Sequence, residues 1–282
     1  MLDRSRPITT LIDCTFLLRL GHRASQPRSR RYWAARQIGL VSVVMEISIH
    51  SLLDGAARAT GTVAVIDVFR AFTTAAVALA NGASKIVMVR TVEEAFALRE
   101  AEIGQICMGE VGGRAPDGFD FGNSPFEIST VDFGGKSIIQ RTSAGTQGIV
   151  AARQAKRLYA TSFVTADATI RAIRSGSPDQ VSLVAMGENG LKRTDEDELC
   201  AIHLRNRLEG RPGDSDAIRR LILAGGEVGR FHDPARPYLH PEDIDIALDF
   251  DRYDFAVRVD FEDGRPVARI ETPAVTMPKS PT

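Results

Sequence analysis

The sequence predicts a layered α/β/α fold with a largely parallel or mixed sheet and a C-terminal antiparallel hairpin. Short apolar runs alternate with segments of helical periodicity over residues 62–208, which is the pattern of βαβ units. In the last forty residues, two stretches alternate in period two around Glu262-Asp263-Gly264, a typical hairpin turn. These two patterns together favour helices covering both faces of one buried sheet.

The first predicted elements lie between residues 62 and 100. Residues 62–66 form a continuous β-branched run, as expected of a buried strand, and residues 70–80 have Ala and Leu at helical spacing. Asn81-Gly82 is a typical helix stop. A second strand follows at 85–90. Thr91 is then suited to cap a helix through about residue 100, because Glu94 stands three positions later.

The remaining elements continue the same alternation. Strands are predicted at 105–108, 137–140, 158–161 and 181–186, with helices at 145–156, 164–174 and 195–208. The hairpin strands cover 254–260 and 266–271 and are expected at an edge of the sheet. Residues 111–135 are rich in Gly and Pro and too long for an ordinary connection, and loops of that length are usually functional.

The composition is that of an ordinary globular protein, with 44% hydrophobic and 25% charged residues. No apolar run approaches the roughly 20 residues that span a bilayer. A net charge of -1 gives no indication of a nucleic-acid or membrane partner. Three cysteines are too few for a disulfide framework, which favours a reducing compartment and a cytoplasmic location.

Residues 1–44 differ from the rest, because they hold eight arginines and only two acidic residues. The totals of 35 basic and 36 acidic residues then leave 27 and 34 in residues 45–282, a net charge of −7. We expect a basic extension, either disordered or upstream of a true start at Met45, with an Arg-rich targeting segment as the alternative. Residues 45–282 are the predicted catalytic domain, as one body or two closely packed lobes.

Candidate site residues follow the predicted strands, because ligands of open α/β sheets bind beyond the carboxyl ends of the strands. Asp67 ends the first strand and is suited to a hard cation such as Mg²⁺. Arg70, Thr73 and Thr74 offer anion-binding donors at a helix start. The alternative interpretation makes Asp67 a helix cap and the two threonines ordinary helix residues.

Two further groups lie after the third strand and in the long loop. Glu110 stands among glycines whose N–H groups could approach a ligand closely, and its carboxylate is expected at the same edge as Asp67. A flexible polar turn is the equal alternative there. Asn123-Ser124-Pro125 lies in the long loop, where turn formation is the favoured interpretation from these residues alone.

The most informative stretch lies between the fourth strand and its helix. Thr142, Ser143, Gly145 and Thr146 combine hydroxyl groups with a helix start that could hold a phosphate or sulfonate. A single hydroxyl cap would need only one of them. Later, an acidic run that includes Glu196 and Asp197 opens a helix. The helix dipole alone explains such a run, although a metal ligand or general base could also come from it.

Several chemistries are excluded by missing motifs. The sequence has no Walker-type G-x-x-x-x-G-K-[ST], no G-x-G-x-x-G opening a helix, and no H-E-x-x-H or paired C-x-x-C. Neither a cysteine-phosphatase loop nor an aspartyl-phosphate D-x-D site is present. Carboxylates combined with Arg, Thr, Ser and Gly at strand ends therefore favour metal-assisted hydrolysis of a phosphate ester.

These motifs, in order, resemble the 2-phosphosulfolactate phosphatases, the ComB family. The similarity runs from about residue 45 to about residue 208 and is carried by five motifs together. They are V-I-D-V-F-R-A-F-T-T at 65–74 with N-G-A at 81–83, G-E at 109–110 with G-G at 112–113, G-F-D-F-G-N-S-P at 118–125, R-T-S-A-G-T at 141–146, and E-D at 196–197 with C-A at 200–201. Phe69 and Phe72 depart from the smaller or different apolar residues common in the family, which leaves the exact substrate open.

The resemblance implies a phosphoric monoester hydrolase that uses Mg²⁺ to convert 2-phospho-3-sulfolactate to 3-sulfolactate and phosphate, in some organisms a step towards coenzyme M. Asp67 and Glu110 are the expected metal ligands. Catalytic roles fall to Asp67, Arg70, Glu196 and Asp197. Substrate binding is expected from Thr73, Thr74, Asn123, Ser124, Thr142, Ser143, Gly145 and Thr146.

The partner is a small anionic phosphate ester, with no nucleic acid and no membrane, and a homodimer is compatible with the sequence. Three alternatives stay open at this level. The first is a phosphatase for another small phospho-acid, and the second is a non-catalytic binder of anionic metabolites. The third and weakest is nucleic-acid binding through the basic residues 1–44.

Overall fold

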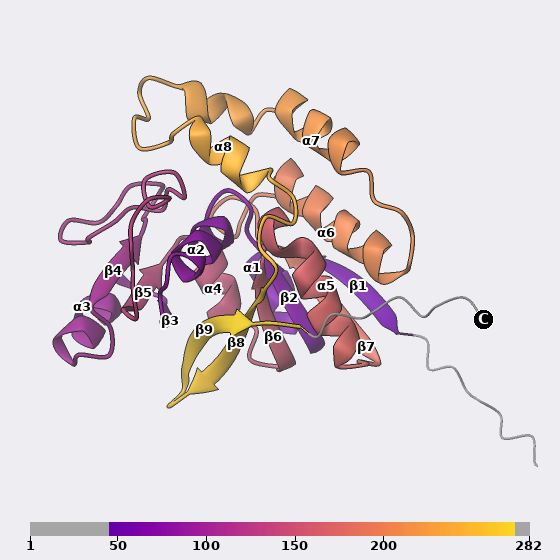
Figure 1. The fold of residues 1–282 in the computed structure, drawn as a ribbon, viewed down its shortest axis with the longest axis horizontal. Coiled ribbons are helices and arrows are strands. Elements are labelled where there is room, and N and C mark those ends of the chain that lie inside the picture. The colour runs from indigo at the N-terminus through magenta and orange to yellow at the C-terminus, as the bar shows by residue number, and fades with distance from the viewer. Residues whose placement is uncertain (1–44, 274–282) are drawn as a thin grey trace, which may run out of the picture. The chain divides into compact units, whose positions relative to one another are not determined.

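A mixed sheet of nine strands forms the centre of the chain in the computed structural model, which describes residues 45–273. The predicted extension 1–44 lies outside the described residues. The strand order is β1-β7-β2-β6-β8-β9-β3-β5-β4 (Figure 1). The strands are β1 (Glu46–Ser51), β2 (Gly61–Ile66), β3 (Lys85–Val89), β4 (Ile106–Gly109), β5 (Ser137–Arg141), β6 (Ala155–Thr161), β7 (Gln180–Ala185), β8 (Ala256–Glu262) and β9 (Arg265–Glu271).

Helices cover both faces of this sheet, which confirms the predicted α/β/α class. Alternate residues of β2 show the two faces, because Val63 and Val65 pack with α1, α2 and α4, while Ala64 and Ile66 pack with α5 and α6. The helices are α1 (Leu52–Arg58), α2 (Ala71–Ala80), α3 (Val92–Glu100), α4 (Gly145–Ala151), α5 (Ala166–Ser175), α6 (Asp195–Leu208), α7 (Ser215–Ala224) and α8 (Glu242–Ala247), with 3-10 turns η1 (Phe163–Thr165) and η2 (Val228–His232).

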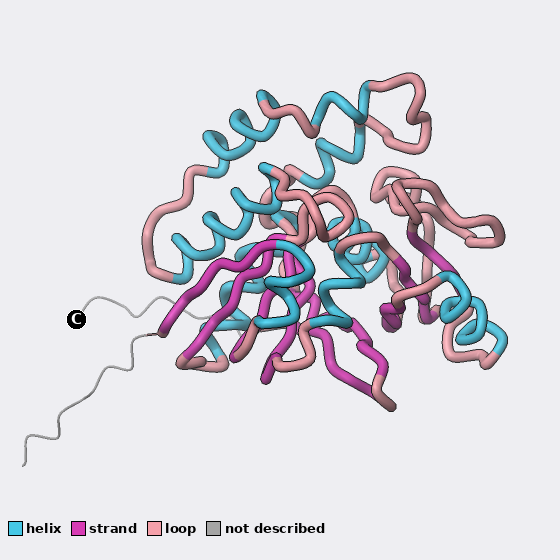
Figure 2. The backbone as a smooth tube through the Cα atoms, turned by 180° about the vertical axis from the view of Figure 1, so that it is seen from behind, coloured by secondary structure: helices cyan, strands magenta, loops and turns pink. Residues whose placement is uncertain are grey.

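The C-terminal hairpin is present, but its predicted position at a sheet edge is wrong. β8 pairs antiparallel with β6, and β9 pairs antiparallel with β3, so the hairpin joins two parallel sets of strands in the middle of the sheet (Figure 2). Its inward residues Val257, Val259 and Ala268 are almost completely buried. The alternation of apolar and polar residues predicted the hairpin. Its neighbours in the sheet could not be predicted in this way, because they come from segments about 100 and 180 residues away in the sequence.

The predicted helix 145–156 is too long. α4 ends at Ala151, and β6 begins at Ala155, because Arg157 and the residues after it pair with β2. Tertiary pairing therefore overrides the helical tendency of the polar stretch after Ala151. The sequence also gave no prediction for β1, α1, α7 or α8.

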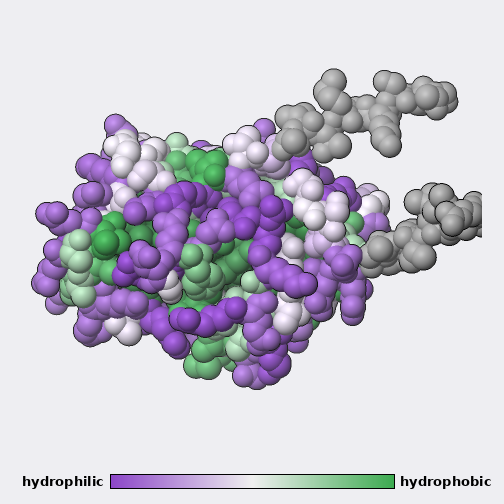
Figure 3. All heavy atoms as spheres, turned by 90° about the horizontal axis from the view of Figure 1, so that it is seen from below, coloured by the Kyte–Doolittle hydropathy of each residue, from purple (hydrophilic) through white to green (hydrophobic). Residues whose placement is uncertain are grey.

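The surface and the helices show the properties expected from the ordinary globular composition. The face in Figure 3 is mainly hydrophilic, with hydrophobic residues gathered in smaller patches. Among the described residues, none of the helices combines the length and the apolar character that crossing a bilayer requires. Cys107 and Cys200 are buried free thiols.

Candidate active site

Residues that follow four different strands meet around one cavity of about 120 Å³. They come from the turns after β2, β4, β5 and β7, together with the first turn of α6 and the segment 230–239. The carboxylates that line the cavity are Asp67, Glu110, Glu188 and Glu196, and the arginines are Arg70, Arg230 and Arg236. The structure therefore brings together the predicted residues Asp67, Arg70, Glu110, Asn123, Ser143 and Glu196.

Asp67 ends β2 and is held by the start of α2. Its Oδ1 accepts a hydrogen bond of 3.0 Å from the Ala71 N–H. A Cβ atom on Gly145 would lie 2.8 Å from Asp67 Oδ2, so only glycine allows the two loops to approach this closely. Burial raises the Asp67 pKa to about 6, the Ala71 N–H opposes this shift, and the nearby Glu110 adds to it.

Glu110 is fixed by its own loop and by the β5–α4 turn. Its Oε1 accepts from the Ser143 N–H at 2.5 Å, and its Oε2 accepts from the Gly113 N–H at 2.7 Å. The Ser143 hydroxyl also donates to Oε2 at 3.0 Å. Gly113 has a φ of 89°, a conformation that glycine adopts without strain. Ser143 therefore orients Glu110, in addition to lining the cavity.

Asp197 joins the ends of two strands. Its Oδ1 accepts from the Val68 N–H at 2.7 Å, and its Oδ2 accepts from the Gly187 N–H at 2.8 Å. Both oxygens are thus used by backbone just beyond β2 and β7, and Asp197 does not line the cavity. Burial, followed by the charges of Glu196 and Asp67, raises its pKa well above the ordinary value. These contacts support a positioning role for Asp197.

Glu196, the preceding residue, lines the cavity. It is 2% exposed, and within the described residues its Oε2 has no hydrogen-bond partner. Burial raises the Glu196 pKa to about 7, while the Arg230 charge acts in the opposite direction. An unpartnered buried carboxyl oxygen is unfavourable unless a ligand or cation satisfies it.

Four predicted substrate-binding hydroxyls lie outside the cavity lining. Thr73 donates to the Val68 carbonyl at 2.8 Å, and Thr74 donates to the Asn123 carbonyl at 3.2 Å. Thr146 donates to the Thr142 carbonyl at 2.9 Å and accepts from the Thr142 N–H at 2.8 Å. The Thr142 hydroxyl accepts from the Thr146 N–H at 3.0 Å. Each of the four hydroxyls therefore bonds to backbone, whereas the sequence alternatives were ordinary helix residues for Thr73 and Thr74 and a single hydroxyl cap at the later helix. Gly145 likewise acts through its close contact with Asp67 rather than by lining the cavity.

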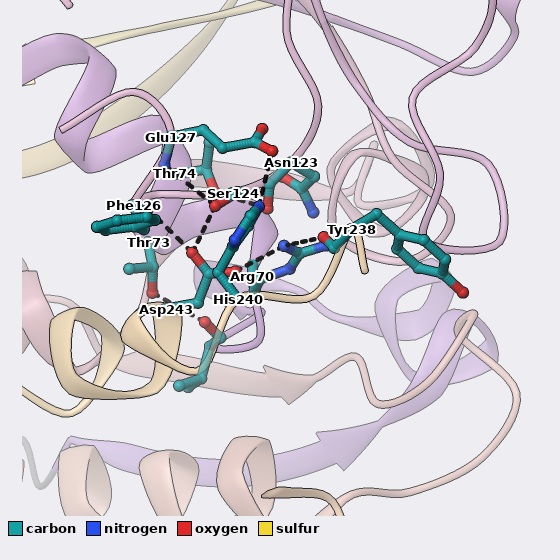
Figure 4. Close-up of polar contacts among 11 residues, drawn as sticks. Arg70, Thr73, Thr74, Asn123, Ser124, Phe126, Glu127, Tyr238, His240 and Asp243 are labelled. Carbon is teal, nitrogen blue, oxygen red and sulfur yellow. Dashed lines mark hydrogen bonds and ion pairs between the residues drawn. The ribbon is translucent and has the colours of Figure 1, made fainter. Parts of the chain in front are cut away.

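Asn123 and Ser124 occupy different environments although they are adjacent. Asn123 lines the cavity, and its buried Oδ1 has no partner in the part of the chain that the structure describes. Ser124 instead donates to Asp243 Oδ1 at 2.6 Å (Figure 4). Asp243 Oδ2 also accepts from Arg70 Nη1 at 2.7 Å, in an ion pair whose side chains are 0% and 4% exposed respectively. The predicted anion-binding residue Arg70 is therefore held partly by Asp243.

Sequence reasoning missed Glu188 and the site residues that the segment 227–243 supplies. Arg230, Arg236 and Tyr238 line the cavity, and Tyr238 stacks beneath the Arg114 guanidinium at 4.6 Å from its ring centroid. Asp243 was also missed. A stretch with three prolines and two arginines between two helices was the available signal, but nothing in its spacing connects it to strand ends about 45 to 165 residues earlier.

The carboxylates fit a hard divalent cation. The unpartnered Glu196 oxygen and the raised pKa values of Asp67 and Glu196 show negative groups whose charge the protein does not fully compensate. Within residues 45–273, no three His, Cys, Asp or Glu side chains form a ready-made metal site. Mg²⁺ is commonly held by one or two carboxylates together with waters and substrate phosphate, which this arrangement permits.

Comparison with known proteins identifies one matching family. The sequence profile of the 2-phosphosulpholactate phosphatases matches residues 48–224. A probable 2-phosphosulfolactate phosphatase of Bacillus subtilis is 34% identical over 184 residues, covering 64% of this chain and 78% of that protein. A protein of the same description from Pseudothermotoga lettingae is 41% identical over 158 residues, covering 56% and 67% of the two chains.

A third relative with this description, from Carboxydothermus hydrogenoformans, is 45% identical over 106 residues, which cover 38% of this chain and 44% of that protein. The profile match includes the strand-end residues Asp67, Glu110 and Glu196 but ends before Arg230. More than half of the chain lies within it. The chain therefore belongs to the 2-phosphosulpholactate phosphatase family.

Proposed function

We propose that this chain hydrolyses 2-phospho-3-sulfolactate to 3-sulfolactate and inorganic phosphate, with Mg²⁺ as its cofactor. Family membership and the descriptions of the relatives as probable 2-phosphosulfolactate phosphatases support this reaction. The main support is the cavity of about 120 Å³, because two carboxyl groups and two guanidinium groups line it together. These belong to Asp67, Glu196, Arg70 and Arg230. A cytoplasmic location and a place in coenzyme M synthesis are supported only by the sequence resemblance and the reducing-compartment composition.

Asp67 and Glu110 would hold the cation, with Glu196 beside them, because their oxygens are the hard ligands that Mg²⁺ prefers. When bound, Mg²⁺ supplies charge neutralisation at the phosphate and a lower pKa for an attacking water. The Ala71 N–H and the Ser143 and Gly113 N–H groups already fix Asp67 and Glu110. A preorganised pair of ligands of this kind does not need to reorder when substrate binds.

The chain's own residues account for the remaining steps. The guanidinium of Arg70 faces the cavity while Asp243 holds its Nη1, so Arg70 can bind an anionic oxygen without losing its position. With a pKa near 7, Glu196 is suited to accept a proton from the attacking water. The water oxygen bonds to phosphorus and the ester P–O bond breaks, and Glu196 passes the proton of the water to the leaving sulfolactate oxygen, which restores its hydroxyl group.

The direct test is phosphate release from synthetic 2-phosphosulfolactate by the full chain, with Mg²⁺ and then with excess EDTA. We expect turnover that requires the metal and returns when Mg²⁺ is restored. A higher kcat/KM for 2-phospholactate or phosphoglycolate would assign the enzyme to another phospho-acid. Thermal stabilisation by these compounds without any phosphate release would show a binder rather than an enzyme.

A further inference from the structure

The 3-10 turn η2 lies beyond the family match and directs one of its residues, Arg230, into the cavity. Its neighbours Val228 and Phe231 are 8% and 2% exposed. Phe231 packs edge-on against Phe69, with 5.2 Å between the ring centroids, in the turn that follows β2. Two buried anchors therefore fix the backbone of Arg230 on either side, and its position does not depend on its own side chain.

The Arg230 guanidinium is only partly used by the protein. Its Nη1 lies 3.3 Å from Glu227 Oε2 and 3.7 Å from Glu188 Oε1. Lys192 Nζ approaches the same two carboxylates at 3.2 and 3.5 Å, so these acidic groups are shared. The Arg230 Nε is buried and has no hydrogen-bond partner within residues 45–273. A guanidinium carries five N–H donors, and a buried unused donor is unfavourable until a ligand accepts from it.

The charge of Arg230 acts at the centre of the site. Arg230 lines the same cavity as Asp67 and Glu196, and its charge lowers the pKa of both carboxyl groups. The other cavity arginines differ from it. Arg70 is bound by Asp243, and Arg236 has a 45% exposed side chain paired with Asp233 at 3.4 Å. Arg230 is thus the cavity arginine with a buried Nε that has no acceptor among the described residues, and it lines the cavity together with the proposed metal ligands.

We propose that Arg230 binds the transferring phosphoryl group directly, and this inference rests on the proposed phosphatase function. A guanidinium matches two phosphate oxygens with two parallel N–H bonds. In phosphoryl transfer, negative charge spreads over the equatorial oxygens, where a fixed cation stabilises the transition state. The proposed active site then includes a residue that lies outside residues 48–224, the part of the chain that matches the family profile.

Two variants test the role in turnover. Arg230→Ala should lower kcat/KM by on the order of 10²- to 10³-fold, and added guanidinium ion should restore part of kcat. Arg230→Lys keeps the charge but loses the paired donors, so a smaller loss of about 10-fold is expected. Arg252→Gln is the control, because Arg252 is also paired with an acidic side chain, Asp249 at 2.8 Å, but lies away from the cavity.

The losses should be equal for 2-phosphosulfolactate and 2-phospholactate, since both carry the reacting phosphoryl group. A loss confined to the sulfonated substrate would overturn the proposal and assign Arg230 to the second acid group. A purely structural role would also overturn it, and would appear as a lowered unfolding midpoint with no rescue by guanidinium. If Arg230→Ala does not fold, Arg230→Lys and its kcat decide the question.

Binding of inorganic phosphate separates this inference from the reaction itself. Calorimetric titration of the full chain with phosphate should give at least about 10-fold weaker binding for Arg230→Ala than for the parent or Arg252→Gln. That result would support the Arg230 contact even if no phosphate ester is hydrolysed. Equal phosphate affinity in the parent and in Arg230→Ala would exclude the contact, whatever the turnover.

Discussion

Asp67 and Glu196 are carboxyl groups in a site that disfavours their charged forms until a ligand arrives. Both are nearly inaccessible to solvent, and burial raises their pKa values to about 6 and about 7. The folded chain therefore binds more protons than the unfolded chain at mildly acidic pH, so these two groups contribute stability that is lost as pH rises through those values. Buried carboxyl groups with raised pKa values are typical of functional sites.

Replacing Asp67 with Asn should separate activity from stability. We expect Asp67→Asn to lower kcat by on the order of 10³-fold, because the proposed metal ligand is lost. At pH 8 its free energy of unfolding should match or exceed that of the parent, since the ionised Asp67 costs on the order of 2–3 kcal/mol in the fold. Denaturant unfolding and phosphate release measure the two effects, and retained turnover would contradict the role of Asp67.

Metal binding should compete with protons at the same groups. Because Glu196 and Asp67 take up protons as pH falls through about 7 and about 6 respectively, the apparent Mg²⁺ affinity should decrease over this interval. Calorimetry in buffers of different ionisation enthalpy would detect the protons released on binding. Glu196→Gln should reduce both the pH dependence and the proton release, and an unchanged profile in this variant would exclude Glu196 from the cation environment.

His203, which does not line the cavity, leads to a further prediction. It is 1% exposed between Phe163 and Phe250, and burial lowers its pKa to about 4. The unfolded chain protonates His203 near pH 6.5, so stability from this group is present above that pH and is lost as pH falls towards 4. We expect His203→Leu to remove about 2–3 kcal/mol of this pH-dependent loss, measured as the difference in unfolding free energy between pH 8 and pH 4.5.

At the scale of elements, α8 and the turn before it are fastened to the site by one buried carboxylate. Asp243 is 0% exposed and accepts from Arg70, from Ser124 and from the Phe126 N–H, the last at 3.0 Å (Figure 4). His240 adds a contact of 2.8 Å to Glu127. These bonds join the segment 227–243 to two loops that precede it by more than 100 residues.

Removal of this carboxylate should destabilise the whole chain. Asp243→Ala leaves Arg70 buried without its counter-ion, which should lower the free energy of unfolding by about 3–5 kcal/mol. Asp245→Ala, two positions later, breaks an exposed pair with Arg219 and should cost less than about 1 kcal/mol. Chemical denaturation compares the two variants, and equal losses would show that α8 is not held through Asp243.

For the whole molecule, the β8–β9 hairpin connects two sets of parallel strands into a single sheet. Val259 is 2% exposed beside β6, whereas Phe261, two residues further along the same strand, is 41% exposed. We expect Val259→Asp to lower the free energy of unfolding by more than about 4 kcal/mol, and Phe261→Asp by less than about 1 kcal/mol. A tolerated Val259→Asp would place the hairpin at an edge of the sheet, in contradiction to its central pairing.

From the sequence alone we could predict the class of fold, the succession of strands and helices, and the strand ends that carry the carboxylates. These features depend on local periodicity, on caps such as Thr91, and on short motifs around Asp67, Glu110 and Glu196, all of which are readable from neighbouring residues. Only the tertiary structure showed that Thr73, Thr74, Thr142 and Thr146 support loops, because a hydroxyl's partner depends on which backbone group packs beside it.

The tertiary structure also decided the central place of the hairpin and the entry of Arg230 and Asp243 into the site. Strand order and long-range ion pairs depend on which distant surfaces pack together, and no local pattern encodes that choice. Residues 227–243 carry ordinary loop and helix sequences, yet they meet the ends of strands formed by the first third of the described chain. The sequence therefore identified most of the carboxylates that line the cavity, and the packing of distant segments brought in most of its arginines.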